Sequence, residues 1–167
     1  DQFRGFENVL KNLPRALKNP GIQILKDQLK NEAILCCAAG PSMDLAWDFL
    51  AEFSPHFPVI AADTIAKPFT ARNLHPNFYT ALERDELLIQ FFRDLPLSAE
   101  SILVSSLYVD PKVFEFFPDR TLFLKPPVPY ADTLGLKHLS LLDAGSSVGP
   151  MNVALALWMG ASKVILI

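Results

Sequence analysis

The sequence predicts an α/β sandwich in which helices pack on a mainly parallel β-sheet. Short apolar runs alternate along the chain with segments of helical periodicity, as in folds built from strand–helix–strand units. Half of the 167 residues are hydrophobic, and a chain of this length can bury about 70% of its extended surface, so a full core needs no disulfide or metal support. We therefore expect one globular, layered α/β unit.

The N-terminal segment, residues 1–30, is expected to form a helical lead-in to the sheet domain, which covers residues 31–167. Its apolar residues recur at helical spacing, and Pro14 is expected to break or kink the helix. These apolar residues are Phe3, Phe6, Val9, Leu10, Leu13 and Leu17.

The predicted strands are short apolar runs that end at turn-forming or charged residues. The first run is continuously apolar, which indicates a strand covered on both faces. The last run ends with the chain and no turn follows it, so we expect the domain to be truncated at its C-terminal end. The predicted strands are residues 33–38, 58–62, 78–82, 101–105, 121–124 and 163–167.

Helices are predicted between these strands. One begins near Met43, where Ser42 can cap it. The clearest helix follows Ser147, with Pro150 in its first turn and Gly160 just beyond its end. Shorter helices are predicted at residues 64–72, 86–93 and 111–117.

The composition disfavours several functional classes. The 18 acidic and 15 basic residues give a net charge of -3, without the basic stripe typical of nucleic-acid binding proteins. The longest uncharged run, residues 144–162, contains a proline and three glycines, so it is a poor membrane span. Cys36 and Cys37 lie in an apolar run and are expected to be reduced core thiols. We expect a cytoplasmic protein without nucleic-acid or membrane partners.

Common nucleotide and metal motifs are missing from the sequence. It contains neither the G-x-x-x-x-G-K-[ST] motif of P-loop enzymes nor the G-x-G-x-x-G motif of nicotinamide enzymes. His56, His75 and His138 lack the spacing of metal ligands, and there is no Asp-x-Asp pair. We expect any bound nucleotide to be held mainly by backbone amides and hydroxyls, with no metal required.

Two loops that precede helices are candidate anion sites. Gly40, Pro41 and Ser42 follow the first strand, where glycine permits close approach of a ligand and free helix amides attract an anion. A tight turn with a serine cap explains the same residues. The late loop with Gly145, Ser146 and Ser147 offers a second set of amides and hydroxyls, although a plain helix start explains it equally well.

Charged residues at the strand ends are the other candidates. Asp63 and Glu83 close the second and third strands, and Asp63 follows Gly40 at about the interval expected of a ribose-binding acid. The alternative explanations are that Asp63 caps a helix and that Glu83 is a solvated surface charge. Arg84 and Lys125 could neutralise a phosphate, although each is also explained as surface charge, and the proline-rich loop that starts at Lys125 can wall a pocket.

In their order along the chain, these motifs resemble the motility accessory factor family, whose central domain is similar to bacterial sialyltransferases and to the archaeal hydroxymethyl-dihydropterin diphosphokinase. The resemblance runs from about Leu17 to the last residue. The matching motifs are residues 38–44, Asp63, Pro76-Asn77 with Glu83, and residues 145–148 before the last strand.

The resemblance implies a Rossmann-like three-layer transferase domain that binds a nucleotide-activated sugar. It implies a donor such as a CMP-activated nonulosonic (sialic-acid-like) acid and transfer to a protein hydroxyl, such as a flagellin serine or threonine. By position, Gly40, Pro41 and Ser42 would hold the donor phosphate, and Gly145, Ser146 and Ser147 would close the crevice from the other side. Asp63 and Glu83 would line it and are the candidate general bases. The pterin branch would instead use ATP and magnesium, with the same two acids as candidate ligands.

The sequence departs from the family pattern at four positions, Ala39, Asn77, Glu83 and Ser146. A non-catalytic Rossmann module of a larger assembly therefore stays open as an alternative. A methyltransferase or nicotinamide enzyme is a third, since Gly40 followed by Asp63 is compatible with adenosine binding. The sequence predicts neither the oligomeric state nor the identity of the sugar and acceptor.

Overall fold

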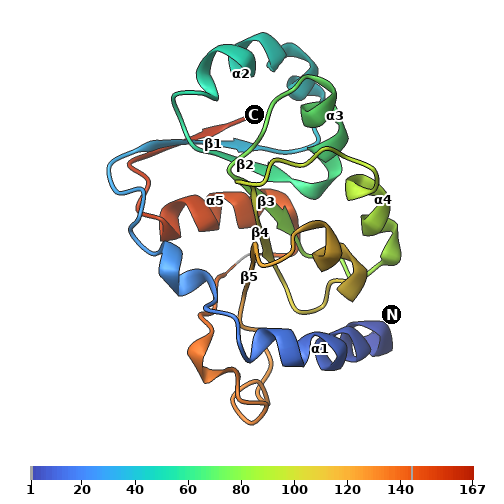
Figure 1. The fold of residues 1–167 in the computed structure, drawn as a ribbon. Helices are drawn as coiled ribbons and strands as arrows, with labels where there is room; N and C mark the ends of the chain where they lie inside the picture. The colour runs from blue at the N-terminus through green and yellow to red at the C-terminus, as the bar shows by residue number, and fades with distance from the viewer. Residues whose placement is uncertain (1, 144) are drawn as a thin grey trace.

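The chain folds around one parallel sheet. The structure is a computed structural model that describes residues 2–143 and 145–167 (Figure 1). Six strands lie in the order β5-β4-β3-β2-β1-β6, and all five pairings are parallel. The predicted α/β class with a Rossmann-like, three-layer arrangement is therefore confirmed. The strands are β1 (Ala33–Cys37), β2 (Val59–Ala62), β3 (Phe78–Ala81), β4 (Ile102–Ser105), β5 (Thr121–Phe123) and β6 (Lys163–Leu166).

Both faces of the sheet are covered. In β1, Leu35 and Cys37 belong to one buried cluster, while Ile34 and Cys36 belong to another on the opposite face. This arrangement explains why the run is continuously apolar, because neither face meets water. The first cluster is covered by α1 (Gln2–Ala16), α2 (Trp47–Phe53), α3 (Ala66–Ala71), α4 (Ile89–Phe92) and the 3-10 helix η5 (Pro111–Phe116); the second is covered by α5 (Val148–Trp158) and the 3-10 helix η1 (Ile22–Leu25) (Figure 1).

Helix α1 runs through Pro14 and ends two residues later at Ala16, so the proline does not break it. The predicted start of the helix that follows β1 is wrong. After β1, a 3-10 helix (η2, Pro41–Leu45) comes first, and α2 starts only at Trp47. Ser42 lies inside η2 and does not cap it, because Pro41 already begins the helical turn after an extended Gly40.

The connections change face at one point of the sheet. Each connection from β1 to β5 passes over the face that carries α2, α3, α4 and η5, whereas the connection from β5 to β6 passes over the opposite face through α5. The strand order reverses at β1, which lies between β2 and β6. Open parallel sheets bind ligands beyond the carboxyl ends of their strands.

No helix in the described part of the chain is both long and apolar enough to cross a membrane.

Candidate functional site

A cavity of about 530 Å³ lies at the carboxyl ends of β3, β4 and β5, beside the start of α5. We call it the carboxyl-end cavity. Its volume is within the range of small-molecule sites, and it lies beyond the carboxyl ends of the strands, where open parallel sheets bind ligands. It is lined by Leu82, Glu83, Arg84, Ser106, Tyr108, Leu124, Lys125, Pro127, Leu141, Leu142, Asp143, Gly145 and Ser146.

More than half of this lining comes from the connection between β5 and α5. The backbone N–H of Lys125 donates to the carbonyl of Ser140 at 2.9 Å, so the intervening segment forms a closed loop. Lys125 and Pro127 of this loop line the cavity, as expected of the proline-rich segment. The cavity wall is therefore built mainly by one long connection resting on a rigid sheet.

The cavity has both basic and acidic groups. Arg84 and Lys125 are its cations, and Glu83 and Asp143 are its carboxylates. The Lys125 ammonium forms an ion pair with Asp132 across 2.6 Å, and its hydrogen bond holds the pKa of Asp132 below its ordinary value.

Tyr108 adds a hydroxyl and an aromatic ring to the cavity wall. Burial raises the pKa of the Tyr108 hydroxyl, with a further contribution from nearby Tyr130 that Arg84 opposes. The hydroxyl therefore keeps its proton at neutral pH and can donate a hydrogen bond to a ligand.

Two acidic residues, Asp63 and Glu83, follow β2 and β3 at the same edge of the sheet. Asp63 is 2% exposed, and its Oδ1 accepts a hydrogen bond from the Thr64 backbone N–H at 2.7 Å. Burial raises the pKa of Asp63 to about 6; the bond from Thr64 opposes this shift, and the charge of Glu83 adds to it. An acid with such a pKa exists in both protonation states near neutrality, which suits proton transfer.

The cavity contains some of the residues predicted from the sequence. Glu83, Gly145 and Ser146 line it, and Gly145 needs to be glycine because its φ is +63°. The remaining predicted residues, Gly40, Pro41, Ser42, Asp63 and Ser147, lie at the same end of the sheet but do not line this cavity.

The backbone of Gly40 is extended, and a Cβ there would meet only Ser42 Oγ at 3.6 Å, an ordinary contact. This position therefore does not require glycine for its conformation. Ser147 is the residue before α5, and its side chain makes no capping hydrogen bond.

Asn152, which ties α5 to the sheet, was not predicted from the sequence. It is 1% exposed, its Nδ2 donates to the Cys37 carbonyl at 3.0 Å, and its Oδ1 accepts from Thr80 Oγ1 at 2.5 Å. One helical side chain thus joins the ends of β1 and β3. The signal that could have revealed it is an amide in a helix that has no charged residue.

The adjacent cysteines are core residues, as expected. Both are buried and free, and burial raises the pKa of Cys36 and of Cys37 to about 12. They therefore stay as thiols at neutral pH and lack the thiolate needed for nucleophilic chemistry.

Within residues 2–143 and 145–167, no group of three or more His, Cys, Asp or Glu side chains is placed to hold a metal ion.

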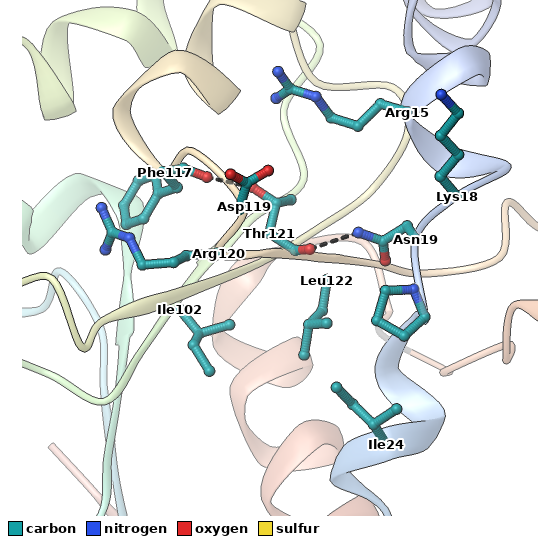
Figure 2. A pocket seen from close by; sticks show the side chains of 11 residues that line it. Arg15, Lys18, Asn19, Ile24, Ile102, Phe117, Asp119, Arg120, Thr121 and Leu122 are labelled. Carbon is teal, nitrogen blue, oxygen red and sulfur yellow. Dashed lines mark hydrogen bonds between the residues drawn. The ribbon is translucent and has the colours of Figure 1, made fainter.

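A second cavity of about 460 Å³ lies beside the free edge of β5, near the amino ends of β4 and β5 (Figure 2). Two half-buried polar side chains of its lining already bond to backbone carbonyls. Asn19 Nδ2 donates to the Thr121 carbonyl at 2.6 Å, and Arg120 Nη1 donates to the carbonyls of Ser98 and Ser101 at 2.8 and 2.7 Å. These groups hold the sheet edge together, so the carboxyl-end cavity is the better candidate for a ligand site.

Comparisons with known proteins agree with this fold. A family model described as "6-hydroxymethylpterin diphosphokinase MptE-like" matches residues 7–167. Among solved structures, the chain is similar to the MAf glycosyltransferase from Magnetospirillum magneticum AMB-1, with a TM-score of 0.72 at 17% sequence identity. The alignment covers 93% of this chain and 27% of that glycosyltransferase chain, so the chain spans about a quarter of its length. No curated protein matches the sequence.

Proposed function

Because the chain belongs to the 6-hydroxymethylpterin diphosphokinase MptE-like family, we propose that it is a glycosyltransferase-like domain that binds a nucleotide-activated sugar in the carboxyl-end cavity. The observation that carries this proposal is the cavity itself, which combines two cations, two carboxylates and hydroxyls at the carboxyl ends of β3, β4 and β5. The fold likeness to a MAf glycosyltransferase supports the choice of sugar transfer. The donor we propose is a CMP-activated nonulosonic acid.

The donor phosphate needs its charge stabilised. Arg84 follows β3 and Lys125 follows β5, and both can pair with a phosphate in the cavity. The free amides at the start of α5 can also donate to it. Because α5 has 11 residues, its partial positive charge at Ser147 favours an anion. In this proposal, no metal is required for the nucleotide to leave.

The acceptor hydroxyl needs a base. Glu83 lines the cavity, so we assign it the role of accepting the hydroxyl proton, with Asp63 behind it. The acceptor oxygen would bond to the anomeric carbon while the bond from that carbon to the phosphate oxygen breaks, and CMP leaves with the electron pair. We propose a protein serine or threonine, such as one of flagellin, as the acceptor, and the cytoplasm as the place of action.

Gly40, Pro41 and Ser42 stay a prediction for the donor phosphate. Their role requires a ligand that extends from the carboxyl-end cavity past Asp63 to the end of β1. Asn152 supports such an arrangement, because it joins the end of β1 to β3.

A second candidate, favoured by the description of the family, is a pterin diphosphokinase that transfers diphosphate from ATP. In this candidate, Asp63 and Glu83 would be the carboxylates for a magnesium ion bound with ATP, since Mg²⁺ commonly takes one or two carboxylates together with substrate phosphates. The ion would neutralise phosphate charge, and the two carboxylates would hold it.

Isothermal titration separates these candidates. Heat on adding CMP, lost in the double variant Arg84→Met/Lys125→Met, is the result we expect. Binding of ATP and a hydroxymethylpterin in the presence of Mg²⁺, without CMP binding, would favour the diphosphokinase. A folded protein that binds none of these ligands would favour the non-catalytic module.

A further inference from the structure

We infer that Gly5 and Asn8 of α1 are positioning residues for the carboxyl-end cavity, because they fix Arg84 and Tyr108 in its wall. This inference rests on the proposed function, since it assigns a ligand to that cavity. It also extends the functional unit into the N-terminal helix, which the sequence suggested to be only a lead-in.

Asn8 connects two loops that are far apart in sequence. Its side chain is 2% exposed, and its Nδ2 donates to the carbonyl of Arg84 at 3.3 Å and to the carbonyl of Tyr108 at 2.8 Å. Arg84 follows β3 and Tyr108 follows β4, and both line the cavity. One amide therefore sets the distance between two walls of the cavity.

Gly5, one turn before Asn8, makes room for the same two side chains. A Cβ at Gly5 would lie 3.3 Å from Tyr108 Cδ1 and 3.6 Å from Arg84 Cδ. The tyrosine ring and the arginine side chain therefore rest directly against the helix backbone. Even a methyl group at this position would push the Tyr108 ring by a few tenths of an ångström.

The rest of α1 strengthens this bridge. Arg4 pairs with Asp85 and Glu86, each at 3.7 Å, next to Arg84. One turn further along, Asn12 Nδ2 donates to the carbonyls of Leu107 and Val109 at 3.0 and 2.9 Å. The helix thus contacts the loop after β3 and the loop after β4 over successive turns.

Core packing alone does not explain the orientation of α1. The helix buries Asn8 and Asn12, yet leaves Phe3 83% and Leu10 45% exposed. Burying an amide is favourable only when its hydrogen bonds are made, so the bonds to the two loops account for which side faces inward.

Asn12 provides a matched control for Asn8. Both are asparagines of α1 with 2% exposure, and each donates two hydrogen bonds to loop carbonyls. However, the carbonyls that Asn12 contacts belong to Leu107 and Val109, which do not line the cavity. Loss of either amide should destabilise the fold to a similar extent, but only Asn8 should affect the ligand.

The test measures CMP affinity by calorimetry and thermal stability for Asn8→Ala, Gly5→Ala and Asn12→Ala. We expect similar drops of Tm in the two asparagine variants, a loss of about tenfold in CMP affinity for Asn8→Ala, and less than twofold for Asn12→Ala. Gly5→Ala should weaken binding several-fold. Equal losses of affinity in Asn8→Ala and Asn12→Ala would overturn the inference.

A double-variant cycle separates positioning from plain stability. In an Arg84→Met background, Asn8→Ala should cost less affinity than in the wild type, because part of its effect passes through Arg84. Fully additive losses would contradict this role.

If the wild type binds no CMP, the proposed function fails, and hydrogen exchange still decides the positioning. Asn8→Ala should speed exchange in residues 83–86 and 106–110, whereas Asn12→Ala should act only on the second segment. Unchanged exchange in residues 83–86 of Asn8→Ala would overturn the inference independently of any ligand.

Discussion

Asn152 and Thr80 share a buried hydrogen bond of 2.5 Å that joins α5 to the middle of the sheet. The Nδ2 of the same amide donates a hydrogen bond to the Cys37 carbonyl at the end of β1. The start of α5 lines the carboxyl-end cavity at Gly145 and Ser146, so this bond fixes the helix whose amides face the proposed ligand.

Replacing Asn152 by leucine should destabilise the protein by about 2–3 kcal/mol, because two buried hydrogen bonds are lost and Thr80 Oγ1 keeps only its 3.5 Å bond to the Ala61 carbonyl. Urea unfolding measures this loss. Thr80→Val in the same background should recover part of it, since the poorly bonded hydroxyl is then removed as well. Additive losses in the double variant would contradict the predicted coupling.

Asp63 should make the protein less stable as the pH rises. Its folded pKa of about 6 lies above the ordinary value of 3.8, so between these values the folded state binds more protons than the unfolded state. The contribution of Asp63 to the free energy of unfolding is therefore fully present below about pH 4, and it is lost as the pH rises past 6. The shift corresponds to roughly 3 kcal/mol.

The Asp63→Asn variant tests this linkage by urea unfolding at pH 4, 5.5 and 7. It should be more stable than the wild type at pH 7, and the difference should vanish near pH 4. Glu100→Gln, at an exposed carboxylate, is the control. A wild-type and an Asp63→Asn curve of the same slope over this range would show that Asp63 does not titrate as described.

The sheet could be predicted from the sequence because its signals are local. Each of the six predicted strands is present, since an apolar run bounded by turn residues is visible in a few consecutive positions. The resemblance to the motility accessory factor family is confirmed by the family match and by the fold of the MAf glycosyltransferase. Residues that directly follow strands, such as Glu83, could be placed near the site for the same reason.

The contacts that shape the cavity could not be predicted because they join distant parts of the chain. Asn8 lies 76 and 100 positions from the residues it holds, and Asn152 lies 72 positions from Thr80. No spacing rule connects such pairs before the fold is known. The orientation of α1 was hidden for the same reason, since its apolar residues suggested an inward face that the structure leaves exposed at Phe3.

Asn19 should protect the free edge of β5 from pairing with other chains. Its Nδ2 donates to the Thr121 carbonyl, and its Oδ1 accepts from the Phe123 N–H at 3.1 Å, so a side chain takes the place of a neighbouring strand. We expect Asn19→Ala to lose about 1–2 kcal/mol of stability and to self-associate.

Urea unfolding and sedimentation velocity measure both effects. Lys18→Ala, which changes the exposed residue before Asn19, is the control. Its sedimentation should match that of the wild type. An Asn19→Ala protein with unchanged stability and sedimentation would show that the edge needs no such cover.

Asp132 should compete with the ligand for Lys125. The two side chains lie 2.6 Å apart, and the Lys125 ammonium is the group that we assign to the donor phosphate. A ligand must therefore share or displace the carboxylate before it gains the full attraction of the cation.

Asp132→Asn should tighten CMP binding by a few-fold, and Lys125→Met should weaken it, both measured by calorimetry at low salt, where ion pairs are least screened. Asp119→Asn, which changes an acid beside the other cavity, is the matched control and should leave the affinity unchanged. Weaker binding in Asp132→Asn would mean that the carboxylate holds Lys125 in its working position instead of competing for it, and the two outcomes differ in sign.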